Sequence, residues 1–201
     1  MSTAPPSRTD GAGDTRGRLI EVAIDLFTRH SFAGTSLQMI ADELGFTKAA
    51  IYHHFRTREQ LLDAVIGPIQ DRLREVIEEA EGLRGTHARA DHLLTGFAEL
   101  AVSHRAVPVL AADPAVALLL RANSDWNDLI ERQLALLSVD EPAPAGAVRA
   151  SVVLAGIAGA SGPAFDELDR DELRDQLIAT GRRALGLRTP RSPARTRKEQ
   201  H

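Results

Sequence analysis

The stretch "GTSLQMIADELGFTKAAIYHHFRTREQLLDAVI", residues 34–66, packs several helix starts and one sharp turn into a short length of chain. Thr35 and Gln38 have the T-x-x-Q spacing of a capping box, which predicts the start of a helix. Gly34 suits a left-handed position before that helix, which stops at Gly45 in a tight turn, and Thr47 can cap the next helix. The stretch therefore predicts two short helices joined by a tight turn.

A further helix precedes this pair. Apolar residues recur at three- and four-residue spacing from Leu19 to Phe27, which predicts a helix over about 15–30. Three short helices with a tight turn before the last are the layout of a helix-turn-helix DNA-binding domain, which we assign to residues 15–60. The Pro- and Gly-containing residues 1–14 are expected to be a disordered leader.

The third helix should present one face to a partner. If Ile51 and Phe55 point to the core, a turn of about 100° per residue directs the intervening residues outward. Small alanines permit close approach to base edges, a lysine can reach guanine acceptors, and tyrosine, histidine, hydroxyl and arginine groups can reach phosphates. The residues expected to contact DNA are Thr35, Ser36, Gln38, Thr47, Lys48, Ala49, Ala50, Tyr52, His53, His54 and Arg58.

The adjacent His53 and His54 also raise the possibility of a metal site. Neighbouring residues on a helix point about 100° apart, so these two cannot hold one ion as an i, i+4 pair does. Binding of phosphate or bases is the favoured interpretation, and neither a metal nor a cofactor is expected.

Composition narrows the class of protein. The chain has 201 residues, 43% of them hydrophobic, no cysteine and a net charge of −4. Thiol catalysis and disulfides are excluded, and no apolar run approaches the roughly 20 residues of a membrane-spanning helix. We therefore expect no membrane association and a cytoplasmic location. Although the net charge is negative, residues 47–58 contain Lys48, Arg56 and Arg58 and no acidic residue.

These motifs carry a family resemblance. "IADELGFTKAAIYHHF", followed by "RTREQLL", resembles the amino-terminal signature of TetR/AcrR-family transcriptional repressors over residues 15–66, with Arg58 where that family usually has lysine. The resemblance implies a homodimer whose recognition helices enter successive major grooves of a palindromic operator. It also implies a carboxy-terminal domain that binds a small-molecule ligand and dimerises through its last two helices.

The rest of the sequence predicts only helices, so the fold class is all-α. Thr57 and Gln60 start a helix that Pro68 should kink or interrupt. Residues 61–187 form the expected ligand-binding and dimerisation domain, and residues 188–201 a basic disordered tail. Its later helices are predicted over 87–104, 106–112, 114–138, 143–161 and 169–186.

Candidate residues within this domain are less sharply defined. Large or polar side chains that could line a ligand pocket, or could equally pack in the core or lie in solvent, are Phe97, His104, Arg121, Asn123, Trp126 and Asn127. In the family context, residues that could form the dimer interface are Val152, Ala155, Gly156, Gly159, Leu177 and Leu185. The alternative for the small residues is helix packing inside one subunit.

Two other functions remain open at this stage. The chain could be a DNA-binding regulator without a small ligand, or an enzyme with a scattered site. No paired carboxylates, Ser-His-Asp order or cofactor loop stands out, so we expect a regulator and not an enzyme.

Overall fold

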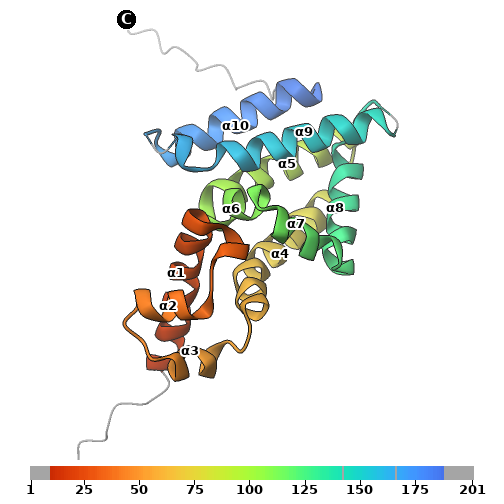
Figure 1. Cartoon of the computed structure of the whole chain (residues 1–201). Coiled ribbons are helices and arrows are strands. Elements are labelled where there is room, and N and C mark those ends of the chain that lie inside the picture. Colours follow the sequence, from red (N-terminus) through yellow and green to blue (C-terminus); the bar gives the residue numbers. More distant parts are fainter. Residues whose placement is uncertain (1–9, 142, 166, 188–201) are drawn as a thin grey trace, which may run out of the picture.

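The structure is a computed structural model that describes residues 10–141, 143–165 and 167–187 (Figure 1). Within these ranges it contains ten α-helices, one short 3-10 helix and no strand, which confirms the predicted all-α class. The helices are α1 (Asp10–Gly34), α2 (Leu37–Glu43), α3 (Lys48–His54), α4 (Arg58–Gly82), α5 (Thr86–Ser103), α6 (Ala106–Ala112), α7 (Pro114–Arg121), α8 (Ser124–Leu137), α9 (Ala145–Ala160) and α10 (Arg170–Leu185).

Figure 1 shows two regions joined by α4. Helices α1 to α3 form a small amino-terminal group, and α9 and α10 lie side by side at the opposite end of the molecule. Helix α5 is central to the second region and packs against α4, α8, α9 and α10. No helix among the described residues is both long and apolar enough to cross a bilayer.

The amino-terminal helix begins earlier than predicted. α1 starts at Asp10, so residues 10–14 are helical and do not belong to a disordered leader. No proline occurs between Pro6 and Pro68, so no proline blocks a helix from extending upstream of residue 15. The remaining leader residues, 1–9, and the basic tail, 188–201, lie outside the described residues.

Pro68 does not interrupt α4, which runs unbroken from Arg58 to Gly82. Its ring lies on the exposed side, while Ile66 and Ile69 on either side of it are buried in the core. Packing of these apolar neighbours therefore outweighs the loss of one backbone hydrogen bond.

The predicted helix over 114–138 is two helices, α7 and α8. Ala122 ends the first helix and Asn123 caps the second, because the Asn123 side chain accepts a hydrogen bond from the Trp126 backbone N–H at 3.0 Å. The predicted α5, α6, α9 and α10 agree with the structure to within one or two residues at each end.

Two contacts fix α10 on α5. A Cβ on Gly181 would lie 2.6 Å from Leu94 Cδ1, so any larger residue would force the Leu94 side chain to move. Arg182 Nε and Nη2 donate to the two carboxylate oxygens of Asp91 at 2.6 and 2.9 Å. The two helices therefore form one unit, and α9 packs on the same unit.

Candidate functional site

The turn between α2 and α3 has the geometry of a helix-turn-helix. Gly45 adopts a left-handed conformation, with φ of 67°, directly after the end of α2. The N–H groups of Phe46 and Gly45 donate to the carbonyls of Ala41 and Asp42 at 2.8 and 3.1 Å. These two hydrogen bonds satisfy backbone carbonyls at the end of α2. Thr47 then caps α3 by accepting from the Ala50 N–H at 3.3 Å.

The outward face of α3 is the first candidate surface. Ile51 and Phe55 are buried, as the helical spacing predicts. The exposed residues are Lys48, Ala49, Tyr52 and His53, and Ala50 and His54 are partly exposed. Lys48 Nζ lies 5.6 Å from the centre of the Tyr52 ring, which is itself 43% exposed, so a cation and a phenol stand together on this face.

The start of α2 differs from the predicted capping box. Ser36 is the N-cap and accepts from the Met39 N–H at 3.2 Å. Thr35 is buried, and its hydroxyl donates to the Ser31 carbonyl at 2.8 Å, so it is directed into the protein. The exposed Gln38 donates to the Asp42 carboxylate at 2.7 Å. Ser36 and Gln38 therefore lie at the surface near α3, whereas Thr35 supports the turn from inside.

Arg58 likewise has an internal task. Its Nη1 lies 2.9 to 3.1 Å from the carbonyl oxygens of Phe32, Ala33 and Thr35, and its guanidinium stacks 4.4 Å from the Phe32 ring centre. These contacts fasten the α1–α2 connection to the start of α4. The guanidinium is thus largely occupied in this structure, although its side chain borders the surface beside α3.

Residues from α2, α3 and α4 line a shallow hollow on the surface. It lies between the start of α2, the outer side of α3 and the start of α4, and its lining residues are Thr35, Ser36, Leu37, Gln38, Lys48, Tyr52, Arg56, Thr57, Arg58 and Glu59. Four members, Leu37, Arg56, Thr57 and Glu59, were not among the predicted contacts, although Arg56 belongs to the acid-free stretch noted in the sequence. Arg16 and Arg18 of α1 stack on Phe55 and Phe46, which adds positive charge beside α3.

The amino-terminal helices are joined to the second region at a bend in α1. Ser31 has a non-helical conformation there, with φ of 63° and ψ of 167°. The next residue, Phe32, donates its N–H to Asp113 Oδ2 at 2.6 Å. Asp113 is only 7% exposed, and its other oxygen accepts from the Ala115 and Val116 N–H groups at the start of α7. One carboxylate therefore ties the bend in α1 to the α6–α7 corner.

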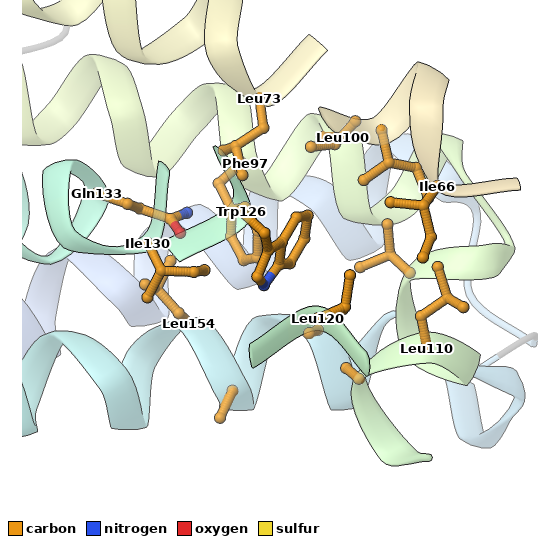
Figure 2. Close-up of a pocket in the computed structure, with 15 residues that line it drawn as sticks. Ile66, Leu73, Phe97, Leu100, Leu110, Leu120, Trp126, Ile130, Gln133 and Leu154 are labelled. Carbon is orange, nitrogen blue, oxygen red and sulfur yellow. The ribbon is translucent and has the colours of Figure 1, made fainter. Parts of the chain in front are cut away.

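A cavity of about 200 Å³, partly open to the surface, lies beyond this corner (Figure 2). Its walls come from α4 to α9, and almost all of them are apolar. The lining residues are Ile66, Ile69, Leu73, Phe97, Leu100, Val107, Leu110, Ala111, Leu120, Trp126, Ile130, Gln133, Leu154, Ala155 and Ala158.

The cavity includes only two of the predicted pocket residues, Phe97 and Trp126. The other four do not line it. His104 faces the Leu100 carbonyl at 3.3 Å, and Arg121 is exposed at the end of α7. Asn123 and Asn127 hold the α7–α8 corner, the former as a cap and the latter by donating to the Arg121 carbonyl at 2.9 Å. These polar groups satisfy backbone at a helix junction instead of facing the cavity.

A second apolar surface lies along α9 and α10. Val152 is 67% exposed and Ala155 is also exposed, while a Cβ on Gly156 or Gly159 would meet nothing within 4 Å outside its own helix. The small residues therefore do not serve close packing inside the subunit. Of the other predicted interface residues, Leu177 and Leu185 are buried in the subunit's own core, because they lie on the inward side of α10. Leu177 also borders the groove between the two helices.

The sequence and the fold both resemble those of known transcriptional regulators. Residues 19–65 match the family model of bacterial regulatory proteins of the tetR family. The HTH-type transcriptional repressor KstR2 of Rhodococcus jostii (strain RHA1) is 26% identical over 140 residues, which cover 64% of this chain and 68% of that protein. The chain spans 25% and 38% of the length of two other curated relatives that it matches.

Solved structures agree over most of the chain. A TetR/AcrR-family transcriptional regulator from Thermobifida fusca YX-ER1 is 25% identical, with a TM-score of 0.53 over 88% of this chain and 100% of that one. The ketosteroid transcriptional regulator KstR2 of Mycobacterium tuberculosis shares the fold at 18% identity, with a TM-score of 0.66 over 92% and 97% of the two chains. Residues 19–65 therefore form a DNA-binding domain of the tetR family, and the relatives together support a TetR-family transcriptional regulator.

Proposed function

We propose that this regulator is a cytoplasmic homodimeric repressor that binds a palindromic operator and leaves it when a small molecule occupies the cavity lined by α4 to α9. The observation that carries the proposal is the path from cavity to DNA-binding surface. Helices α6 and α7 contribute to the cavity wall, and the corner between them is bonded through Asp113 to the bend in α1.

The proposed DNA contacts use the exposed face of α3. Ala49 and Ala50 allow that face to approach base edges, and Lys48 reaches guanine acceptors. Tyr52, His53 and His54 contact phosphates, together with Ser36 and Gln38 at the start of α2. In this proposal Thr35, Thr47 and Arg58 position the surface from behind, and Arg56 adds a phosphate contact.

The proposed dimer pairs α9 and α10 with the same helices of a second copy. The outer side of α9 is smooth and apolar. It consists of the exposed Val152 and Ala155 and of Gly156 and Gly159, where a Cβ would meet no neighbour. Phe165 and Leu168, both partly exposed, extend the face beside α10. In a dimer with two-fold symmetry, this face of one subunit packs against the same face of the other. The contact then sets the distance between the two α3 helices.

The proposed release follows from that spacing. Two recognition helices must lie about 34–36 Å apart to enter successive major grooves. A ligand that is accommodated better by one spacing shifts the population towards it. Because α6 and α7 touch both the cavity and the α1 bend, displacement of these helices moves the whole amino-terminal group relative to the dimer face.

The test begins with selection of bound sequences from a random DNA pool, followed by fluorescence anisotropy at several salt concentrations. The proposal expects a palindrome and a dimer by light scattering. Lys48→Ala should weaken operator binding by about tenfold or more and relax the preference at one position in each half-site. Arg170→Ala, at the start of α10 and far from α3, is the matched control and should bind normally.

Some results would count against this function. If Lys48→Ala and Tyr52→Phe both bound the selected DNA as tightly as the unaltered protein, α3 would not be the reading helix. A monomer at micromolar concentration would remove the dimer. An operator complex that no small molecule dissociates in a release screen would favour a regulator without a ligand.

A further inference from the structure

We propose that the cavity selects a compact, neutral and mainly apolar molecule that carries one oxygen, which accepts a hydrogen bond from Gln133. The inference rests on the proposed function in that the same cavity is the regulatory site, and it specifies the class of ligand.

The key observation is a buried amide without a partner. Gln133, on α8, is 1% exposed, and its Nε2 forms no hydrogen bond with any described residue. It belongs to the inward stripe of α8, one turn from the fully buried Leu129 and Leu137. Figure 2 shows its amide among the lining side chains, turned towards the ring of Trp126.

An unsatisfied buried amide is costly. Leaving such a donor unpaired costs on the order of 1–3 kcal/mol, so most buried polar groups in proteins have a partner. An apolar residue at this position would complete an otherwise apolar wall without that cost. A donor held at the cavity wall instead favours a ligand that brings an acceptor, such as a carbonyl or hydroxyl oxygen.

The rest of the wall determines the remainder of the ligand. Apart from Gln133 and the Trp126 indole, every lining residue is aliphatic or phenyl, and none carries a charge. A carboxylate or ammonium group would lose its hydration here and find no counter-charge, which is far more costly than burying a neutral group. The ligand is therefore neutral where it meets this wall.

The volume of the cavity limits the size of the ligand. A cavity of about 150 Å³ lined by apolar side chains holds benzene in another protein, so the roughly 200 Å³ found here suits one ring with a short substituent. Phe97 and Trp126 provide flat surfaces for that ring, and Gln133 lies beside the Trp126 surface.

Three probes of nearly equal shape test this class by titration calorimetry with the full-length protein. Cyclohexyl methyl ketone has the ring and the acceptor, isopropenylcyclohexane replaces the carbonyl with a carbon–carbon double bond, and cyclohexanecarboxylate replaces the methyl ketone with a charge. We expect the ketone to bind about tenfold more tightly than the alkene. The carboxylate should bind at least about a hundredfold more weakly than the ketone.

Substitutions test whether Gln133 is the residue that gives the preference for the ketone. Gln133→Met keeps an unbranched side chain of similar length but removes the donor, so ketone binding should fall about tenfold while alkene binding is retained. This variant should fold at least as stably as the unaltered protein, because it removes an unpaired buried amide. Gln70→Met, on α4 and outside the cavity, is the matched control and should keep the ketone preference.

The inference is overturned if the alkene binds as well as the ketone, if the carboxylate binds best, or if Gln133→Met keeps the ketone preference. Failure of all three probes to bind at millimolar concentration also overturns it. These outcomes are separate from those of the proposed function. If the ketone binds but does not dissociate the operator complex, ligand release fails and the ligand class stands. If a charged molecule releases the DNA, repression by release stands and the ligand class fails.

Discussion

Replacement of Asp113 tests whether one carboxylate joins the two regions of the molecule. Asp113→Ala removes the cap of α7, a loss of about 1 kcal/mol, and leaves the buried Phe32 N–H without an acceptor, a cost of about 1–3 kcal/mol. We therefore expect the free energy of unfolding to fall by roughly 2–4 kcal/mol. In a chain of this length the decrease corresponds to roughly 10 °C in Tm.

The matched control is Asn123→Ala. Asn123 caps α8 as Asp113 caps α7, but its side chain is exposed and forms no bond between the two regions. This variant should lose only about 1 kcal/mol. Asp113→Asn should fall between the two, because its single amide oxygen cannot serve both the α7 cap and the Phe32 N–H.

The assay is urea unfolding followed by helical circular dichroism at one protein concentration, since dimerisation would make stability depend on concentration. Near-equal losses in Asp113→Ala and Asn123→Ala would refute the reasoning, because the bond to Phe32 would then contribute nothing. A second readout is hydrogen exchange of the Phe32 amide, which should become faster in Asp113→Ala and remain unchanged in Asn123→Ala.

Three further predictions concern other parts of the structure. Gly45→Ala should cost about 1–2 kcal/mol in urea unfolding, because its φ of 67° disfavours a side chain, and Gly45→Asn should cost less. Val152→Glu should shift the protein from dimer to monomer by light scattering while its helicity remains unchanged, since the residue is 67% exposed in the subunit; an intact dimer would exclude the α9 face. Hydrogen bonds from Arg132 lower the pKa of Glu81, so this stabilisation is complete above the ordinary carboxyl pKa and is lost as the pH falls through the folded-state value. In Glu81→Gln the acid side of the stability–pH curve should be slightly flatter, and an unchanged curve would contradict the pairing.

The helix-turn-helix could be predicted from sequence because its signals are local. Gly45 and Thr47 act on residues within one turn of themselves, and the inward Ile51 and Phe55 follow from helical spacing alone. The capping box at Thr35 was wrong by one residue, since Ser36 offers the same chemistry and only the backbone conformation decides which hydroxyl caps.

The roles that sequence reasoning missed depend on partners far along the chain. Asp113 bonds to a residue 81 positions away, and Arg58 to carbonyls 23 to 26 positions away, so neither link has a signature in a short window. The pocket prediction selected polar residues of the α7–α8 corner, where they cap helices. Gln133 did have a local signal, because it interrupts an apolar stripe between Leu129 and Leu137.

The composition of the cavity wall also has a practical consequence. Trp126 is the one tryptophan of the 201 residues, and it lines the cavity. The tryptophan emission of the protein, excited selectively at the red edge of its absorption, therefore originates beside the bound molecule without any label. A cavity filled with water and one filled with an apolar guest place the indole in media of different polarity, so the emission maximum should move to shorter wavelength on filling. The emission maximum of Trp126 therefore reports whether the cavity is occupied. It can be measured for the free protein and for the DNA complex in the same sample.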